Sequence, residues 1–577
     1  MKKLFACFRG YRKQMILGPL FKLTEAILEL MIPLLMADII DVGIRNGDRG
    51  YVVTHGLFML SLGAIGLVCA LICQYFAAVC AQGFGRSLRK TLFRHIFSLS
   101  QKEYGTIGTD SLITRLTSDV NQVQTGVNMF IRLAVRAPFL TGGSIVMALL
   151  IDWKIGLIFL VSTPLIVLVL YVIMSRSVPY YLQIQKGQDR ISRLAGENLE
   201  GARVIRAFSR QKSEVETFDV AGDDLAKTTV YVGKISAALN PITSVIVNLA
   251  IVAIVWFGAR FTDMGILEQG QIIALVNYMT QTLLALIVLA NIIVVLTRAV
   301  ASARRIAQVL EQQTSMQDVA ESQKALSGSP YIEFENVSFR YHSGGDEALE
   351  KISFQVDKGW TLGIIGGTGC GKTTLARLLA REYDVTAGKI KIEGVDIRDY
   401  TLADLHQKIG LVPQTAMLFS GTIRSNLKLG NETADDTVLW KALDTAQGAE
   451  FVHSKPDGLD TVIEEGGKNL SGGQKQRLTI ARALAKQPQI LILDDSASAL
   501  DYATDAALRK ALRRDTRGMT VVMISQRAST IKNADRILVL DDGRMCGYGT
   551  HEQLLNNCEV YREICRSQKL LSEEGVQ

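Results

Sequence analysis

The first three hundred residues alternate between long apolar stretches and polar connections. Six stretches are apolar for about twenty residues or more, the length that a helix needs to cross a membrane. This pattern predicts an all-α transmembrane domain of six helices over residues 1–310, with a kink at Asn240 and Pro241 because proline removes a helix hydrogen bond. The predicted spans are roughly 15–40, 55–80, 127–151, 155–175, 236–259 and 272–297.

The connections after the second and fourth spans are much longer than a turn, and SLITRLTSDVNQVQ and ENLEGARVIRAFSRQ keep a helical period. We expect long helical extensions of the spans whose tips press on another domain; a solvated hairpin without contacts is the alternative. Both connections are basic, whereas the other three are short and hold few basic residues. The positive-inside rule then predicts a multi-pass protein of the cell membrane with cytoplasmic extensions and both termini in the cytoplasm. The basic residues are Arg86, Arg89, Lys90, Arg94, Lys102 and Arg115, then Lys186, Arg190, Arg193, Arg203, Arg206, Arg210 and Lys212.

Charged residues within the first span raise the question of a substrate path. Lys22, Glu25 and Glu29 are spaced three and four residues apart and share one helical face. Charge inside a membrane is costly, so this face either lines a wet path or pairs locally, Lys22 with Glu25. Both interpretations stay open. The candidate path residues are Glu25, Glu29, Asn277 and Gln281, and their acidic character slightly favours cationic cargo.

After a polar linker over 311–329, short strands alternate with helices over 330–577, which predicts an α/β P-loop domain with a parallel sheet. The segment GGTGCGKT fits G-x-x-x-x-G-K-[ST] and stands between an apolar strand and a helical pattern. In such a loop, backbone N–H groups turn toward phosphate oxygens and the helix N-terminus adds positive potential. We expect Lys372 to reach the terminal phosphates and Thr373 to bind Mg²⁺. The predicted ATP-binding residues here are Gly366, Gly367, Thr368, Gly369, Cys370, Gly371, Lys372, Thr373 and Thr374.

A second apolar strand, QILILD, ends in a carboxylate at Asp494. A carboxylate in this position, downstream of a phosphate loop, is typical of a residue that orients magnesium. The two motifs together predict ATP and Mg²⁺ as cofactors.

Between these motifs stands LSGGQ, formed by Leu470, Ser471, Gly472, Gly473 and Gln474. With this signature the whole chain resembles the ATP-binding-cassette (ABC) family, and its six-span layout is similar to the exporters of that family. Small residues at a helix N-terminus make a second anion-binding end. The resemblance implies that this end clamps ATP held by another subunit, so that ATP joins a dimer.

The resemblance also assigns roles to residues outside the phosphate loop. It implies that Tyr341 stacks on adenine, that Gln414 joins Thr373 and Asp494 as a magnesium ligand, and that residues 464–466 meet the helical extensions. It further implies that a short loop faces the partner domain: Ser498, Ala499, Leu500 and Asp501.

At two positions the chain departs from the family pattern. The residue after the magnesium Asp is normally a glutamate that acts as base toward the attacking water, and here it is Asp495; Gln526 stands where a histidine usually contacts the γ-phosphate. An Asp carboxylate sits about 1.5 Å further back than that of Glu, and Gln cannot carry imidazolium charge. A homodimer would therefore contain two impaired sites. We expect a heterodimer with a second half-transporter, with one degenerate site here and one competent site that this chain's signature completes.

Composition agrees with this interpretation. Hydrophobic residues make up 48% of the chain, and the net charge of +7 is explained by basic cytoplasmic connections, so no nucleic-acid partner is expected. The eight cysteines lack paired spacing, which argues against a disulfide framework or a zinc site.

The predicted function is ATP-dependent export of small amphipathic molecules, of the multidrug type, across a lipid bilayer. An exporter of lipids or peptides is one alternative, because fold does not fix substrate. An ATP-gated channel or regulator that hydrolyses little ATP is another.

Overall fold

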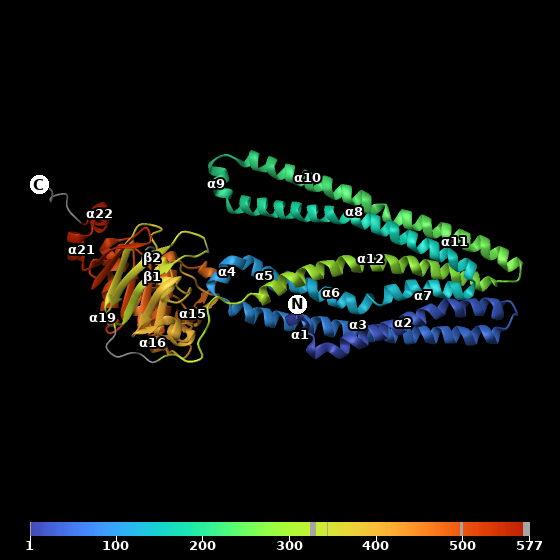
Figure 1. The fold of residues 1–577 in the computed structure, drawn as a ribbon, viewed down its shortest axis with the longest axis horizontal. Coiled ribbons are helices and arrows are strands. Elements are labelled where there is room, and N and C mark those ends of the chain that lie inside the picture. The colour runs from blue at the N-terminus through green and yellow to red at the C-terminus, as the bar shows by residue number, and fades with distance from the viewer. Residues whose placement is uncertain (1, 324–329, 343, 497–499, 569, 571–577) are drawn as a thin grey trace. The chain divides into compact units, whose positions relative to one another are not determined.

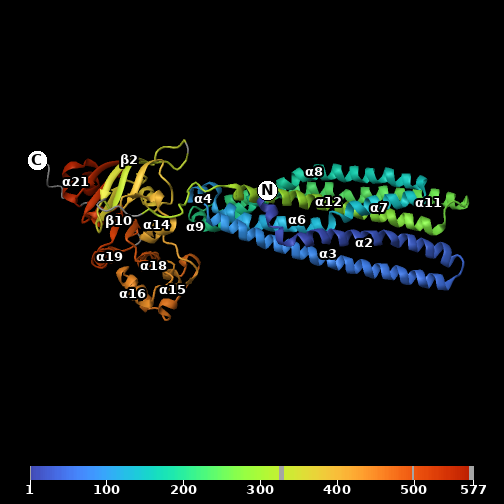
Figure 2. The ribbon, with the colours of Figure 1, turned by 60° about the horizontal axis from the view of Figure 1, so that its bottom comes forward.

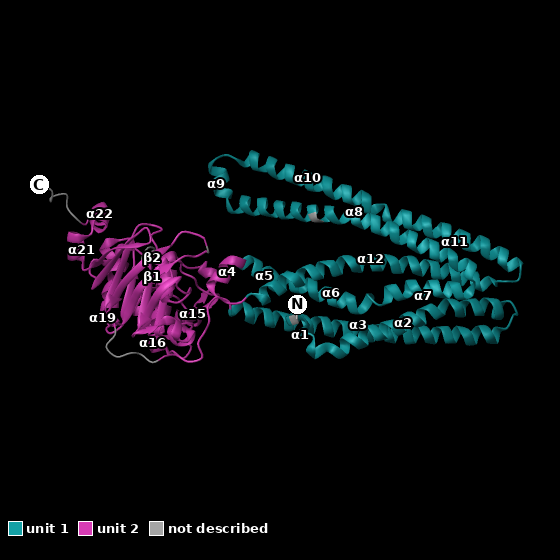
Figure 3. Cartoon of the chain, viewed as in Figure 1, with its two compact units in different colours: residues 1–98, 108–312 teal, residues 99–107, 313–577 magenta. Residues whose placement is uncertain are grey.

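The computed structural model describes residues 2–323, 330–342, 344–496, 500–568 and 570, which fall into two units (Figure 3). The first unit comprises residues 1–98 and 108–312, and the second comprises residues 99–107 and 313–577. The described part of the first unit is helical, and every strand that the structure describes belongs to the second.

Long helices build the first unit (Figure 1). The helices are α1 (Lys2–Ala6), α2 (Arg12–Asp38), α3 (Arg49–Phe97), α5 (Thr109–Thr114), α6 (Val120–Leu133), α7 (Arg136–Ile151), α8 (Trp153–Glu200), α9 (Ala202–Ala207), α10 (Gln211–Ala237), α11 (Leu239–Asp263) and α12 (Gln269–Glu311). Short turns complete them: η1 (Arg9–Tyr11), η2 (Ile39–Ile44) and η3 (Arg115–Asp119).

Polar residues fix where several of these helices begin. The Asp48 carboxylate accepts a hydrogen bond from the Tyr51 N–H at 3.0 Å and caps α3. Asp152 caps α8 by accepting from two backbone N–H groups at 2.9 Å each. Glu268 and Gln271 form a reciprocal capping box at α12. These caps satisfy N–H groups that a helix start leaves without partners, and they separate adjacent apolar helices in the sequence.

Among the described residues, five helical runs are long and apolar enough to cross a membrane. They are Arg49–Phe97, Thr109–Ile151, Trp153–Glu200, Gln211–Asp263 and Gln269–Glu311, and they contain the last five predicted spans. The first predicted span is helical as α2, but it carries Lys22, Glu25 and Glu29. A sixth crossing therefore stays a prediction.

Both long connections are helical, as the sequence predicts. Helix α8 runs for 48 residues, about 70 Å, whereas a bilayer's hydrocarbon core is about 30 Å thick. Helices α8 and α10 pack side by side as an antiparallel pair joined through α9 (Figure 1). The break expected at Asn240 and Pro241 lies slightly earlier, at Ala238, because Pro241 fits within the first turn of α11, where it costs no helix hydrogen bond.

Small residues let the helices of the first unit approach closely. A methyl group at Gly126 of α6 would come within 2.3 Å of the Ala299 Cβ of α12, so only glycine fits. The buried Tyr278 hydroxyl of α12 donates to the Leu30 carbonyl of α2 at 2.5 Å. Close backbone approach and interhelical hydrogen bonds stabilise helix packing where solvent supplies no hydrophobic drive.

Two larger sheets organise the second unit (Figure 2). The six-stranded sheet has the order β12-β11-β3-β10-β9-β6, in which β11, β3, β10, β9 and β6 are parallel and β12 is antiparallel. The four-stranded sheet, β2-β1-β4-β5, is antiparallel. The prediction of an α/β domain with a parallel sheet is therefore confirmed.

The elements of the second unit have the following bounds. The strands are β1 (Ile332–Phe339), β2 (Leu349–Val356), β3 (Thr361–Gly366), β4 (Ala387–Ile392), β5 (Val395–Asp396), β6 (Ile409–Val412), β7 (Gly421–Thr422), β8 (Val462–Ile463), β9 (Ile490–Asp494), β10 (Thr520–Ile524), β11 (Arg536–Asp541) and β12 (Arg544–Gly549). The helices are α4 (Gln101–Ile107), α13 (Lys372–Leu379), α14 (Leu402–Lys408), α15 (Ile423–Lys428), α16 (Asp436–Thr445), α17 (Ala449–His453), α18 (Gly472–Ala485), α19 (Tyr502–Asp515), α20 (Ala528–Ile531), α21 (His551–Asn557) and α22 (Glu559–Ser567), with the 3₁₀ turns η4 (Ile397–Asp399), η5 (Gly458–Asp460) and η6 (Glu465–Gly467).

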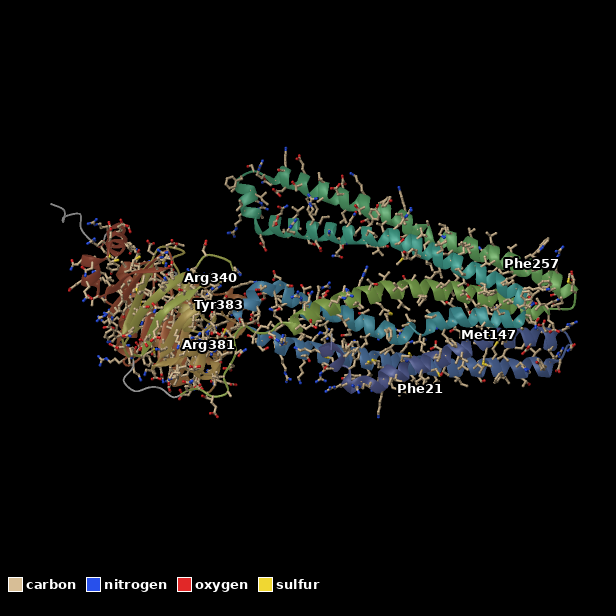
Figure 4. All side chains as sticks on the ribbon, viewed as in Figure 1. Phe21, Met147, Phe257, Arg340, Arg381 and Tyr383 are labelled. Carbon is tan, nitrogen blue, oxygen red and sulfur yellow. The ribbon has the colours of Figure 1, made fainter. Side chains whose placement is uncertain are left out.

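The described part of the linker packs onto the second unit. Arg381, labelled in Figure 4, is almost fully buried, and its guanidinium donates to the carbonyls of Ile397, Tyr400 and Gln317 at 2.9–3.2 Å. The buried Glu103 carboxylate of α4 accepts from the Ser100 N–H at 2.9 Å and from the Ser315 N–H at 3.3 Å. Residues 313–323 are therefore held by side-chain hydrogen bonds to distant parts of the sequence.

Candidate functional site

The phosphate loop predicted from GGTGCGKT joins β3 to α13. Gly371 has φ +98° and precedes the helix, a left-handed conformation that favours glycine. A Cβ at Gly366 would lie 2.0 Å from the Leu540 carbonyl oxygen of the neighbouring strand β11. The glycines thus serve the tight turn and close packing, and the loop leads directly into the N-terminus of α13.

Lys372 folds back over this loop. Its buried ammonium donates to the Gly366 carbonyl at 2.9 Å and to the Gly367 carbonyl at 2.5 Å, and it lies 3.6 Å from Cys370 Sγ. The only cation that the motif supplies is therefore held inside the loop, where phosphate oxygens could replace the carbonyls as its partners.

Thr373 and Asp494, predicted as magnesium ligands, lie together. The Thr373 hydroxyl donates to Asp494 Oδ1 at 3.1 Å, from the first turn of α13 to the end of β9. Burial raises the pKa of Asp494, and the neighbouring Asp495 adds to that rise, while the Thr373 hydrogen bond opposes it. A hydroxyl and a desolvated carboxylate are the hard oxygen ligands that Mg²⁺ prefers.

Four neighbouring parallel strands bring the other predicted groups to one edge of the sheet. In the order β3-β10-β9-β6, the strands lead respectively to the phosphate loop, Gln526, Asp494 with Asp495, and Gln414. Parallel strands end at the same edge, which is where open α/β sheets bind ligands. Gln414 and Gln526 are both exposed there.

Asp495 has an unusual backbone. Its φ is +44°, and its N–H donates to the Ile524 carbonyl at 3.0 Å. Burial raises the pKa of its carboxyl, and the nearby Lys372 and Arg527 oppose that rise. The residue that replaces the expected glutamate is thus fixed at its main chain and partly desolvated.

Tyr341 lies beside the helix that follows the phosphate loop. Its hydroxyl is 3.0 Å from the Thr374 hydroxyl, and its ring packs edge-on against Phe339 and Tyr383 with centroids 4.9 and 5.4 Å apart. The sequence analysis missed Tyr383 and also Glu382, whose pKa burial raises. Both stand shortly after α13, but no local motif marks them.

The signature residues lie in the helical part of the second unit. Ser471 caps α18: its hydroxyl accepts from the Gln474 N–H at 3.3 Å, while the Ser471 N–H donates to Gln474 Oε1 at 3.0 Å. Leu470 is buried in the hydrophobic cluster formed by α15, α16 and α18. Gly472 is exposed, and a Cβ there would meet no atom within 4 Å. The packing of this chain therefore gives no reason for glycine at 472.

The loop expected to face the partner domain is only partly described, because Ser498 and Ala499 lie outside the described residues. Leu500 is buried. Asp501 caps α19 by accepting from the Thr504 N–H at 2.9 Å, and this hydrogen bond lowers the pKa of Asp501.

In the first unit, the candidate path residues are largely engaged. Lys22 and Glu25 form a local ion pair at 2.6 Å, and Glu29 pairs with Arg136 of α7 at 2.8 Å. The Asn277 amide donates to the Ile273 carbonyl of its own helix at 3.1 Å. Gln281 Oε1 is buried and has no hydrogen-bond partner within the described structure. Because both carboxylates are neutralised, the expected preference for cationic cargo loses its basis.

Comparison with known proteins decides the family. The model of the ABC transporter transmembrane region matches residues 15–314, and that of the ABC transporter domain matches residues 349–498. The chain belongs to the ABC transporter family. It is an ATP-dependent, membrane-spanning ABC exporter, with one transmembrane region and one ATP-binding domain in this chain.

Relatives of this ABC transporter align over nearly its whole length. An uncharacterized ABC transporter ATP-binding protein of Mycobacterium tuberculosis is 35% identical over 98% of both chains. A probable multidrug resistance ABC transporter ATP-binding/permease protein of Bacillus subtilis is 32% identical over 100% of this chain and 99% of its own. An ATP-dependent lipid A-core flippase of Chromobacterium violaceum is 30% identical over 98% of this chain and 96% of its own. The solved structure of a bacterial Atm1-family ABC exporter with ATP bound matches with a TM-score of 0.81 at 25% identity, over 98% of this chain and 99% of that one.

Proposed function

We propose that this ABC transporter chain is one half of a heterodimeric exporter and contributes one degenerate ATP site together with the signature of a competent one. The observation that carries the proposal is the sheet edge at which Lys372, Asp494, Asp495 and Gln526 gather. Two of these four residues differ from the family's usual Glu and His. Both differences fall where the γ-phosphate of the same nucleotide would lie.

The phosphate loop and its neighbours fit Mg²⁺-ATP. Lys372 would exchange loop carbonyls for phosphate oxygens, and Thr373, Asp494 and Gln414 would hold the metal. When bound, Mg²⁺ neutralises charge on the phosphates and on Asp494, which removes part of the desolvation cost that raises the pKa of this carboxyl. Tyr341, anchored by Thr374, would offer its ring to adenine.

Hydrolysis at this site would be slow because Asp495 cannot reach forward. Its N–H is bound to the Ile524 carbonyl, so the main chain does not shift to compensate for a side chain one methylene shorter than Glu. A misplaced general base commonly costs about 10²–10⁴-fold in rate. Gln526 retains a hydrogen-bond donor for the γ-phosphate but supplies no positive charge.

The signature would serve a nucleotide held by another chain. The exposed N-terminus of α18 carries Gly472, which nothing in this chain requires, and a helix N-terminus favours anions. Close approach of a phosphate from outside accounts for the missing side chain. An intact signature beside an impaired base then points to a partner that supplies its own Glu and His.

The test compares ATP hydrolysis by the purified chain alone in lipid nanodiscs with hydrolysis by the chain co-purified with a companion half-transporter. We expect the chain alone to turn over at least one hundred times more slowly than the pair. Hydrolysis by the chain alone at tens per second would exclude a degenerate site. Vanadate trapping of ADP at Lys372, with the partner site unreacted, would exclude the proposed division of labour.

We further propose small amphipathic molecules as the cargo, because a relative of this length bears a multidrug resistance name. A lipid exporter is the second candidate, supported by the flippase name of other relatives. An open apolar groove of about 510 Å³ between α2 and α7 would accept acyl chains; it is lined in part by Ile27, Met31, Phe139 and Val146. Reconstituted vesicles that export a cationic or neutral dye but do not flip labelled lipid would favour the first candidate, and the reverse would favour the second. Peptide export and ATP-gated channel activity remain alternatives to be scored in the same vesicles.

A further inference from the structure

A single side chain near the C-terminus holds the loop that carries Gln526. The Gln568 amide nitrogen donates to the Gln526 carbonyl at 2.7 Å, and the Gln568 amide oxygen accepts from the Ala528 N–H at 2.7 Å. One planar amide thus binds the main chain on both sides of Arg527. Only this orientation of the amide works, because the flipped one would oppose two acceptors and two donors.

Helix α22 fixes the position of Gln568. Tyr561 and Cys565 on this helix are fully buried in a hydrophobic cluster that includes Ala528 and Ile531 of α20. The helix continues to Gln568 through the hydrogen bond from its N–H to the Ile564 carbonyl at 3.2 Å. The amide is therefore presented from a packed element and not from a free tail.

The same loop is held from two other directions. The Ser525 N–H donates to the Ile364 carbonyl of β3 at 3.1 Å, and the Arg527 N–H donates to the Ser525 hydroxyl at 3.0 Å. The Arg527 guanidinium lies over the Tyr502 ring, 5.0 Å from its centre. With its main chain bound on every side, the loop presents the exposed Gln526 side chain in one place at the sheet edge.

We infer that Gln568 is a positioning residue for Gln526, and that through it the C-terminal helix sets how well this site distinguishes ATP from ADP. The inference rests on the proposed contact of Gln526 with the γ-phosphate. ADP lacks that phosphate, so a change in the placement of Gln526 alters ATP affinity and leaves ADP affinity in place. A role in packing alone would weaken both nucleotides or neither.

The experiment measures the affinities of ATP and ADP, each with Mg²⁺, for the full chain in nanodiscs by displacement of a fluorescent nucleotide. Gln568→Met keeps length and removes both hydrogen bonds, and Gln568→Glu keeps the acceptor for Ala528 but places a carboxylate against the Gln526 carbonyl. Each variant should weaken ATP binding about threefold to tenfold, the worth of one or two neutral hydrogen bonds, and should change ADP binding less than twofold. The matched control is Gln553→Met, which removes the hydrogen bond from the Thr550 N–H to Gln553 Oε1, 2.9 Å long, at the start of α21 and leaves the loop untouched.

Gln526→Ala separates the inference from the proposed function. If Gln526→Ala lowers the preference for ATP and both Gln568 variants leave it unchanged, the positioning role is wrong while the site stands. If Gln526→Ala has no effect on the preference, the γ-phosphate contact is wrong and the inference falls with it. Equal weakening of ATP and ADP in both Gln568 variants would also overturn the inference, because it would show a purely structural role.

Discussion

In the first unit the buried charges are matched by neighbours of opposite sign, whereas in the second unit the acidic groups at the sheet edge are not. Asp119 illustrates the first case: burial alone would raise the pKa of its carboxyl, but hydrogen bonds from Arg305 and Ser302 bring it below the ordinary value. Asp494 and Asp495 illustrate the second, because burial prevails and raises the pKa of both. A matched pair holds a fold together, and an unmatched cluster in a defined pocket is where ligand chemistry is expected.

The largest expected effect tests the unmatched cluster. Asp495→Glu combined with Gln526→His should raise ATP hydrolysis by the chain alone about 10²-fold or more, because the base regains its reach and the phosphate regains a cation. Steady-state phosphate release from nanodiscs measures it. Asp435→Glu, at the cap of α16, makes the same chemical change away from the site and should have no effect. An unchanged rate in the double variant would mean that these two residues do not limit hydrolysis.

A new charge at the signature should have the next largest effect. Gly472→Asp places a carboxylate at the exposed N-terminus of α18, where it would repel the partner's γ-phosphate. Hydrolysis by the heterodimer should fall about tenfold to a hundredfold, while ATP binding at Lys372 of this chain stays the same. Ala403→Asp adds the same charge to the exposed first turn of α14 and serves as the control. Full activity in Gly472→Asp would leave the signature without its proposed role.

The matched side of the comparison predicts a smaller loss of stability. Glu29→Gln and Arg136→Gln should each destabilise the transmembrane unit by about 1–2 kcal/mol, since each leaves a partly buried charge alone, and the double variant should lose less than their sum. Thermal unfolding in detergent measures these changes. The exposed Arg45–Glu268 pair, 3.6 Å apart, is the control and should contribute less than about 0.5 kcal/mol. Altered dye export with unchanged stability would instead restore Glu29 to the substrate path.

The smallest effect concerns a group that stays neutral because it is buried. Burial lowers the pKa of His406, and the nearby Lys486 and Arg381 add to the decrease, while a hydrogen bond to the Ala380 carbonyl opposes it. The unfolded chain then binds the proton first, so stability is complete above the ordinary histidine pKa of about 6.5 and falls as the pH drops below it. His406→Gln should flatten this pH dependence by one or two degrees in melting temperature between pH 7 and 5. Gln407→Asn, on the same helix, should keep the wild-type slope.

Local sequence signals predicted the ATP-binding unit well for physical reasons. A phosphate loop needs glycines, a lysine and a threonine at consecutive positions, so Lys372 and Thr373 could be read from eight residues. The strand that ends at Asp494 is uniformly apolar because both of its faces are buried. Long apolar stretches likewise predicted the helices of the first unit.

Contacts between distant positions could not be predicted in this way. Gln568 meets residues forty positions earlier, and Arg305 meets Asp119 across 186 positions. Neither pairing follows from a periodic pattern, because a pair is specified only when the fold brings its members together. The charges of α2 were visible in the sequence, but whether they line a path or pair depended on Arg136 of another helix.

The uninterrupted run of α8 has a mechanical consequence. The helix passes through Pro164 and Pro179 without a break, so it acts as a single lever about 70 Å long. Tilting such a rod by only about 5° at one end carries the other end sideways by about 6 Å, close to one helical turn. A displacement of one side chain's width where ATP is handled therefore needs very little rotation among the packed helices, and the reverse holds for cargo.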